Sequence, residues 1–265
     1  MTTSEKNSDS PKLDDLKEMV LAAGDIVRRN YGQVRSVGKK GVIDLVTETD
    51  LESEKFLVEQ IQNQFPNSSA VAEEGSGLEG DEDSMWFIDP IDGTVNFAHG
   101  LPIFCVSLGY QHKGELQHGV VYNPISENLF TASRDMGAEL NGQTIRVSTA
   151  ASLENSLLVT GFPYDTWTNP YNNLKEFNRL SKKTQGVRRL GSAALDLCYV
   201  AAGWLDGFWE TSIKPWDIAA GGLIVREAGG IVSKLHGEED FMSAPQSIVA
   251  ANPVLHPLLL DELAK

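Results

Sequence analysis

The amino-acid sequence predicts a mixed α and β protein in which helices pack against two sheets. Three observations support this prediction: apolar residues recur at helical spacing near the start of the chain, β-forming residues crowd residues 104–147, and strand-like and helix-like segments alternate after residue 150. Because both sheets need their apolar faces covered, we expect a third layer, made of helices, to pack against them.

The composition is that of a globular protein whose main role is not at nucleic acids or membranes. The 265 residues suffice for a sizeable core, as one domain or two closely packed halves, and 41% of them are hydrophobic. The 22 basic residues against 37 acidic ones give a net charge of −15, which disfavours direct binding to nucleic acid or to an anionic membrane. Because the chain has a polar start and no apolar run of about 20 residues, we expect a cytoplasmic location. Cys105 and Cys198 lie in apolar segments and are expected to be buried, reduced thiols.

The first half of the chain contains two predicted helices and an antiparallel-looking run of strands. Residues 1–11 are polar and should form a disordered tail. Helical spacing predicts a first helix over 12–30, and a second runs from about Asp50 to Phe65, where Thr49 and Glu52 stand in the relation of a capping box. Strands are predicted within 44–50 and at 85–88, 104–110, 119–122, 129–132 and 138–147, the last broken by a hairpin at Asn141-Gly142.

The second half alternates strands with helices. Strands are predicted at 156–160, 187–190 and 207–210, and helices at 171–182, 193–202 and 217–228, with Gly229-Gly230 ending the last helix.

Residues 85–94 carry the strongest chemical signal, because a short apolar strand runs into the sequence Asp89-Pro90-Ile91-Asp92-Gly93-Thr94. Two aspartates three residues apart, with a proline that fixes one φ angle, can place both carboxylates and the Ile91 carbonyl around a small space. Hard divalent cations such as Mg²⁺ bind such oxygen ligands, and the N–H groups of Gly93 and Thr94 can hold a phosphate. A bland surface turn uses the same residue types, so this segment alone does not separate the two interpretations.

Four other segments are also open to two interpretations. Glu73-Glu74 follows a predicted strand end and is either a pair of metal ligands or a solvated acidic face. Asp217 opens an apolar helix, where one oxygen can cap the helix while the other binds a metal. Helix capping fully explains residues 47–50. The small-residue turn at 188–194 either packs tightly or admits a sugar ring.

Taken together and in this order, these segments resemble the inositol monophosphatase family. The matching motifs are Asp44-Leu45-Val46-Thr47-x-x-Asp50, Glu73-Glu74-Gly75, Trp86 to Phe97 around the two aspartates, Trp216-Asp217-x-Ala219-Ala220-Gly221 and Glu227-Ala228-Gly229-Gly230. The resemblance covers residues 13–252, and no single alternative above explains all of the motifs at once. It implies a layered α-β-α-β-α sandwich of the inositol monophosphatase and fructose-1,6-bisphosphatase type, formed by one catalytic domain over 12–265 whose halves are 12–148 and 149–265.

Carried over residue by residue, the resemblance implies a site for two or three Mg²⁺ ions. Glu73, Asp89 and the Ile91 carbonyl would bind one ion, and Asp89, Asp92 and Asp217 a second, while Glu73 would also reach a third. Glu73 and the Thr94 hydroxyl, itself held by Asp50, would position the attacking water. The residues implied to contact the substrate are Gly93 and Thr94 at the phosphate, Lys39 near the site, and Asp92, Gly191, Ala193 and Glu210 at the inositol hydroxyls.

The implied activity is that of a Mg²⁺-dependent, lithium-sensitive phosphomonoesterase that acts, as a homodimer, on myo-inositol 1-phosphate and related small sugar or polyol phosphates. Two departures bear on the substrate: Lys214-Pro215 precedes Trp216, and Gly161-Phe162-Pro163-Tyr164 replaces the serine-containing loop near the family's sugar site. Histidinol phosphate, fructose 1,6-bisphosphate, an NADP-type phosphate and an adenosine bisphosphate therefore stay open as substrates. The alternative from another class is a regulatory binding protein on this scaffold, since bacterial relatives also contact the transcription machinery.

Overall fold

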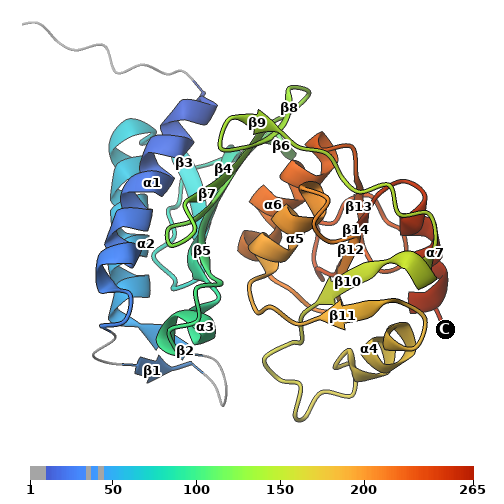
Figure 1. Ribbon diagram of the computed structural model, residues 1–265. Coiled ribbons are helices and arrows are strands. Elements are labelled where there is room, and N and C mark those ends of the chain that lie inside the picture. Colours follow the sequence, from blue (N-terminus) through green and yellow to red (C-terminus); the bar gives the residue numbers. More distant parts are fainter. Residues whose placement is uncertain (1–9, 34–36, 41–44) are drawn as a thin grey trace, which may run out of the picture.

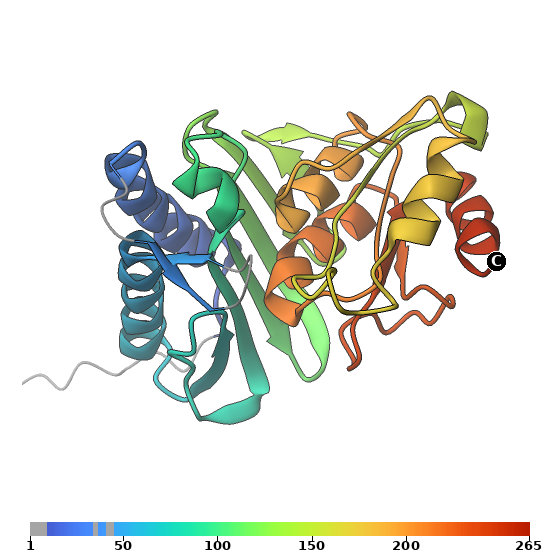
Figure 2. The ribbon, with the colours of Figure 1, turned by 90° about the horizontal axis from the view of Figure 1, so that it is seen from below.

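The protein is built in five layers, as the computed structural model shows for residues 10–33, 37–40 and 45–265 (Figure 1). Two helices, a seven-stranded sheet, two central helices, a five-stranded sheet and two outer helices follow one another across the molecule. Figure 2 shows the same central helices between the two sheets from a second direction. The predicted α-β-α-β-α sandwich is therefore confirmed. Of the predicted tail, only Ser10 and Pro11 lie among the described residues.

The first layer consists of α1 (Leu13–Asn30) and α2 (Glu48–Gln64). The apolar stripe of α1 is buried, as its spacing predicts. The capping box of α2 lies two residues earlier than predicted: the Thr47 hydroxyl accepts the Asp50 N–H at 3.4 Å, and the Asp50 carboxylate accepts the Thr47 N–H at 2.9 Å. The prediction of Thr49 and Glu52 was wrong because Thr47, with extended backbone after β2 (Leu45–Thr47), already starts the helix. A short antiparallel partner, β1 (Val37–Lys39), pairs with β2.

The larger sheet has the order β3-β4-β5-β6-β7-β8-β9. Only β3 and β4 are parallel, and the remaining neighbours form the predicted antiparallel run. Its second strand continues past the predicted end at Ile88 and is bulged between Asp89 and Asp92. The strands are β3 (Ser68–Ala72), β4 (Asp81–Asp92), β5 (Cys105–His112), β6 (Glu115–Asn123), β7 (Asn128–Ser133), β8 (Gly137–Leu140) and β9 (Gln143–Thr144).

The smaller sheet has the order β11-β10-β12-β14-β13. The central β12 is parallel to β10 and antiparallel to β14. The outer helices α4 (Leu174–Ser181) and α7 (Leu255–Leu263) cover its far face (Figure 1). Helix α4 begins three residues later than predicted, because its N-cap Asn173 takes a left-handed φ of +67°. The strands are β10 (Leu157–Thr160), β11 (Gly186–Arg188), β12 (Gly207–Glu210), β13 (Ile231–Ser233) and β14 (Ile248–Ala251), with one 3₁₀ turn, η1 (Leu153–Asn155), before them.

The central layer is formed by α5 (Ala193–Ala201) and α6 (Pro215–Glu227), and these helices pack against both sheets. Glycines of the larger sheet let α6 approach closely, since a Cβ on Gly119 would lie 2.9 Å from the Ala220 Cα. At the end of α6, the Gly230 N–H bonds to the Val225 carbonyl and Gly229 has a φ of +87°, as the sequence predicts. Both cysteines are buried and free, also as predicted. Within the described ranges, no helix is long and apolar enough to cross a bilayer.

Candidate active site

Four acidic residues from both halves of the chain face a common region. Glu73 follows β3, Asp89 and Asp92 lie on the bulged end of the neighbouring β4, and Asp217 lies in the first turn of α6. Asp89 is only 1% exposed. Burial, and then the charges of Glu73, Asp92 and Asp217, hold the pKa of the Asp89 carboxyl well above its usual range. The fold therefore brings the predicted acids together, close enough to repel one another.

Asp217 is not the helix N-cap that one interpretation of the sequence suggests. The N-cap of α6 is Lys214, and Pro215 occupies the first helical position. The Lys214 N–H donates to Oδ2 of Asp217 at 2.9 Å, so this carboxylate belongs to a capping box and keeps its other oxygen for a ligand. Burial, followed by the charges of Asp92 and Glu73, holds the pKa of Asp217 well above its usual range.

Asp92 ties the two halves together. Its carboxylate accepts the Ser192 hydroxyl at 2.6 Å and the N–H groups of Ala193 and Ala194 at 3.2 and 2.7 Å. It thus caps the N-terminus of α5 from the other half of the chain, where the helix dipole favours a negative charge. Burial raises the pKa of Asp92, and these hydrogen bonds oppose the rise. A contact over 100 residues of sequence has no local signal, and the sequence did not predict it.

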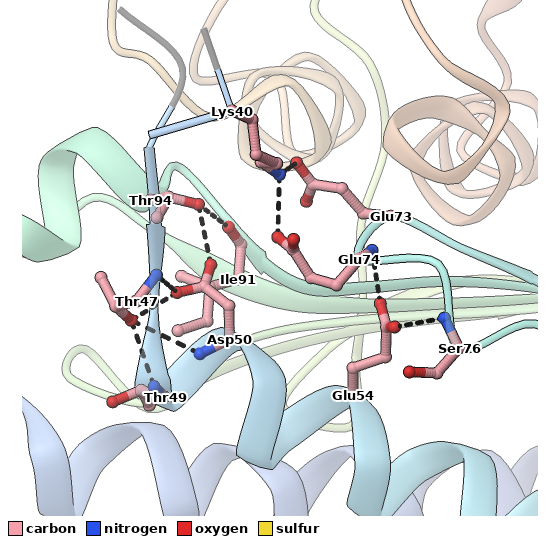
Figure 3. Close-up of polar contacts among 10 residues, drawn as sticks. All are labelled: Lys40, Thr47, Thr49, Asp50, Glu54, Glu73, Glu74, Ser76, Ile91 and Thr94. Carbon is pink, nitrogen blue, oxygen red and sulfur yellow. Dashed lines mark hydrogen bonds and ion pairs between the residues drawn. The ribbon is translucent and has the colours of Figure 1, made fainter. Parts of the chain in front are cut away.

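Thr94, Asp50 and the Ile91 carbonyl form a buried polar group next to the acids (Figure 3). The Thr94 hydroxyl lies 2.9 Å from Oδ1 of Asp50 and 3.0 Å from the Ile91 carbonyl oxygen, and its single proton serves these two acceptors. The other oxygen of Asp50 is held by the N–H of Thr47. The contact between Asp50 and Thr94 is the one that the resemblance implies.

Gly93 joins β4 to the short helix α3 (Thr94–Ala98) in a left-handed conformation, with a φ of +97°. A Cβ there would lie 3.0 Å from the Ile103 carbonyl and 3.1 Å from that of Gly191, so both the backbone and the space require glycine. Asn96 holds the same turns together, since its Nδ2 donates to the carbonyls of Ile103 and Leu190 at 2.7 and 2.8 Å. The turn at 188–194 is therefore packed against the candidate phosphate site.

A cavity of about 340 Å³ opens beside the acids. Glu210 lies on its wall, and burial raises the pKa of this carboxyl to about 8, against the opposing charge of Arg189. The side chain of Glu210 covers Gly161, where a Cβ would lie 1.7 Å from Oε1. The other cavity residues are Asp92, Phe162, Pro163, Tyr164, Asp165, Gly191, Ser192, Ala193, Asp196, Ser212, Ile213, Lys214 and Asp217.

Asp196 and the guanidinium of Arg189 are charged groups of this cavity to which the sequence gave no role of their own. Asp196 is 1% exposed and its Oδ1 lacks a hydrogen-bond partner, and burial holds the pKa of its carboxyl well above the usual range. The signal that could have found it is a lone acid within the apolar helix α5. Arg189 lies opposite, close enough for its charge to oppose that rise in the pKa of Asp196.

Among the side chains that the structure describes, the lysine that reaches the acids is Lys40. The Lys40 ammonium donates to Oε1 of Glu73 at 2.9 Å and to Oε1 of Glu74 at 2.8 Å (Figure 3). The backbone of Lys39 ends β1, whereas its side chain lies outside the described part of the structure, as does Asp44. Glu73 and Glu74 are therefore not a solvated face, because their side chains are 13% and 3% exposed and share one cation.

The types of candidate ligand atom suit hard divalent cations, although the described side chains do not form a complete coordination site. All the candidate ligands are carboxylate or carbonyl oxygens, and Oδ1 of Asp89 is buried without a hydrogen-bond partner. The accumulated negative charge also calls for a cation. Within the ranges that the structure describes, however, no three His, Cys, Asp or Glu side chains already have the arrangement of a metal site.

The sequence and the fold both match known proteins. The Inositol monophosphatase family matches residues 11–265. An inositol-1-monophosphatase of Synechocystis sp. is 46% identical over 271 aligned residues, covering 100% of this chain and 94% of that protein. The Nus factor SuhB of Pseudomonas aeruginosa is 43% identical, covering 96% of each chain. The solved structure of an inositol monophosphatase from Anabaena (Nostoc) sp. superposes with a TM-score of 0.86 at 41% identity, covering 95% of this chain and 94% of that one. The chain therefore belongs to the inositol monophosphatase family.

Proposed function

We propose that this protein is a Mg²⁺-dependent phosphomonoesterase that hydrolyses myo-inositol 1-phosphate and related small polyol phosphates. Membership of the family supports a phosphatase. The observation that carries the proposal is the gathering of buried acids from both halves of the chain around Asp89, one of whose oxygens is buried without a partner. A cluster of like charges is costly unless a cation neutralises it.

Glu73, Asp89, Asp92, Asp217 and the Ile91 carbonyl would hold two or three Mg²⁺ ions. When bound, these ions supply Lewis acidity for an in-line displacement at phosphorus and an acidified water. The hydrogen bond from Thr94 leaves the Ile91 carbonyl a second lone pair, so it can serve as a ligand while it accepts that bond.

The remaining residues would position the reactants. Glu73 would accept a hydrogen bond from the attacking water and so orient it towards phosphorus. The Thr94 hydroxyl, oriented by Asp50, would hold the same water. The backbone N–H groups of Gly93 and Thr94 would bind the phosphate. Phosphoryl transfer needs positioning and charge more than covalent help, and this arrangement supplies both.

The cavity next to the acids suits a hydroxylated leaving group. Carboxyl oxygens of Glu210 and Asp196 lie on its wall, and such oxygens accept hydrogen bonds from hydroxyls. Gly191 and Ala193 leave room for a ring because their side chains are small. We propose that the phosphate lies near Gly93 and that the polyol extends towards Glu210.

The test is phosphate release from myo-inositol 1-phosphate, with and without Mg²⁺, by the wild type, Asp89→Asn and a matched control, Asp83→Asn, which changes an exposed aspartate of the same strand. We expect turnover that requires Mg²⁺, a loss of about 100-fold or more in Asp89→Asn, and an unchanged control. Wild type without turnover, or Asp89→Asn with full turnover, would contradict the proposal.

A panel with histidinol phosphate, fructose 1,6-bisphosphate, NADP, adenosine 3′,5′-bisphosphate and glycerol 2-phosphate then ranks the substrates by kcat/KM. Inositol 1-phosphate should rank first. Lithium should inhibit the reaction, and light scattering should give the mass of a homodimer. We also propose a cytoplasmic location, which cell fractionation would check.

A second function is favoured by the name of one relative. The Pseudomonas protein that is 43% identical is named a Nus factor, and we propose that this chain acts as one in addition to its catalysis. The net charge of −15 favours a protein partner over direct contact with RNA. A pull-down with RNA polymerase, using wild type and Asp89→Asn, would test this function separately from activity. We expect RNA polymerase to capture the two proteins equally. If it captures neither protein, the second function is contradicted.

A further inference from the structure

The turn that presents Glu73 is held from below by Glu54, a residue of α2 to which the sequence gave no role. Its Oε2 accepts the Glu74 N–H at 2.7 Å and its Oε1 accepts the Ser76 N–H at 2.8 Å (Figure 3). Each oxygen of one carboxylate therefore holds one backbone group of the same turn. Bonds between a charged acceptor and an N–H group are stronger than neutral ones, and two of them fix the turn in one shape.

The position of Glu54 is unusual for a charged side chain. It is 0% exposed and lies on the same buried face of α2 as Leu57, Val58 and Ile61. A buried carboxylate is costly unless it is fully hydrogen-bonded, so an apolar residue would pack here at lower cost if packing were the only requirement. We infer that its value lies in the geometry of the turn, which carries Glu73 and Glu74.

From the opposite side, Lys40 binds the two side chains of that turn. Its ammonium takes one oxygen from Glu73 and one from Glu74, at 2.9 and 2.8 Å. An ammonium on Oε1 of Glu73 competes for the negative charge that a divalent cation at this carboxylate would use. Lys40 follows β1, and its side chain is still 27% exposed, so it can leave the acids without breaking the core.

We propose that Glu54 and Lys40 are positioning residues with opposite effects on metal binding: Glu54 fixes the turn that presents Glu73 to the metal, and Lys40 is an internal cation that the metal displaces. The inference rests on the proposed function, because it takes Glu73 as a metal ligand. Two opposite effects on one binding constant separate it from a purely structural role, in which either loss would weaken the site.

The experiment measures Mn²⁺ binding to the full-length protein by calorimetry and by the electron paramagnetic resonance of free Mn²⁺. The variants are Glu54→Gln, Glu54→Ala and Lys40→Met, with Glu73→Gln as the reference for a lost ligand. Matched controls on the exposed side of α2 are Glu59→Gln and Lys55→Met, which make the same charge changes away from the turn. Circular dichroism and thermal melting report the fold of each variant.

Glu54→Gln keeps one acceptor oxygen but turns an N–H donor towards the second backbone N–H. We expect its Mn²⁺ affinity to fall by about tenfold, and that of Glu54→Ala by up to about 100-fold, the range found for residues that orient metal ligands. Saturating Mg²⁺ should restore the kcat of Glu54→Gln. Lys40→Met should bind Mn²⁺ more tightly by up to about fivefold, because the metal no longer has to break a partly exposed ion pair with Glu73. The two controls should bind as wild type does.

The outcomes separate the inference from the function on which it rests. If Glu73→Gln binds Mn²⁺ as wild type does, the metal site itself is wrong, and both proposals fall. If Glu73→Gln loses binding while Glu54→Gln retains all of it, only the role of Glu54 is overturned. If Lys40→Met binds more weakly than wild type, Lys40 supports the ligands and does not compete with the metal. Should Glu54→Ala fail to fold, Glu54→Gln carries the test.

Discussion

The two halves of the molecule contribute to the site in different ways. The half at 12–148 supplies its acids from neighbouring strand ends, with Glu73 after β3 and both Asp89 and Asp92 on the bulge of β4. The half at 149–265 supplies a fourth acid, Asp217, and most of the residues that line the cavity. The acids of the first half thus come from a short run of sequence, whereas the residues that line the cavity come from segments that only the fold brings together.

The two contributions meet where the cavity wall touches the bulge of β4. The cavity wall is built from the turns at 161–165, 189–193 and 210–214. The middle turn bonds Asp92 on the bulge of β4 through Ser192 and Ala193. Further contacts join the two halves at the same place. Asp92 caps α5, and Asn96 bonds the carbonyls of Ile103 and Leu190.

The largest effect is expected where the C-terminal half enters the chemistry. Asp217→Asn keeps an oxygen that can accept the Lys214 N–H and so should leave α6 intact, but it removes a charge from the proposed metal site. We expect kcat/KM for inositol 1-phosphate to fall by about 100-fold or more, with an unchanged circular dichroism spectrum. Asp261→Asn, an exposed aspartate of α7, is the control. Activity within a fewfold of wild type would remove Asp217 from the metal site.

A smaller effect, confined to one substrate class, is expected at the cavity wall. Glu210→Met removes both oxygens, and we expect the KM for inositol 1-phosphate to rise by about tenfold while kcat changes less, because a hydrogen bond to a hydroxyl is lost. Glu210→Gln keeps one acceptor and should be milder. Gly161→Ala should act in the same direction, since its Cβ would collide with the Glu210 carboxylate. An equal rise in the KM for glycerol 2-phosphate would show that Glu210 does not bind the inositol hydroxyls.

At Thr94 the expected effect is smaller again and falls on kcat. Thr94→Ala removes the hydroxyl that lies between Asp50 and the Ile91 carbonyl, and we expect kcat to fall by about five- to tenfold, the worth of one hydrogen bond. Thr94→Ser keeps the hydroxyl and is its matched control. Steady-state kinetics at saturating Mg²⁺ measure both, and equal activities of the two variants would contradict a role for the hydroxyl.

The smallest effect is a pH dependence of stability that differs with and without metal. Burial raises the pKa of Glu73 to about 7 and that of Glu210 to about 8, whereas unfolded glutamate titrates near about 4.3. The contribution of these protons to stability is therefore complete below about pH 4 and is lost as the pH rises through 7 and 8. We expect the Tm of EDTA-treated protein to fall by a few degrees between about pH 5 and 8, and the Tm with Mg²⁺ to rise. Parallel curves would contradict this account.

Local periodicity and turn residues predicted most elements and a layer of helices against two sheets, whereas the five-layer order was implied by the resemblance to the family. The apolar stripe of α1 and the Gly229-Gly230 ending are examples of such local signals. The predicted start of a helix was wrong where a single residue determines it. Examples are the N-cap Thr47 of α2 and the left-handed Asn173 before α4. Asn173 receives the Trp209 Nε1 proton at 2.6 Å and donates to the Gly161 carbonyl at 2.7 Å, which are long-range contacts without a local pattern.

For the candidate site, the acids were predicted but most of their supporting residues were not. Glu73, Asp89, Asp92 and Asp217 were each found by a motif. Glu54 acts through backbone N–H groups 20 and 22 residues away, and no motif marks such a partner. Lys40 reaches the acids although no motif marks it. The predicted role of Lys39 stays a prediction, because its side chain lies outside the described residues.

The most direct test of the central claim is anomalous X-ray diffraction from crystals of the wild-type protein soaked in Mn²⁺. We expect at least two Mn²⁺ peaks within coordination distance of the Asp89 carboxylate, with Glu73 turned away from Lys40 and Asp217 contributing its free oxygen. Absence of Mn²⁺ peaks at Asp89, with the Lys40 ion pairs still in place, would contradict the claim that acids from both halves form one metal site.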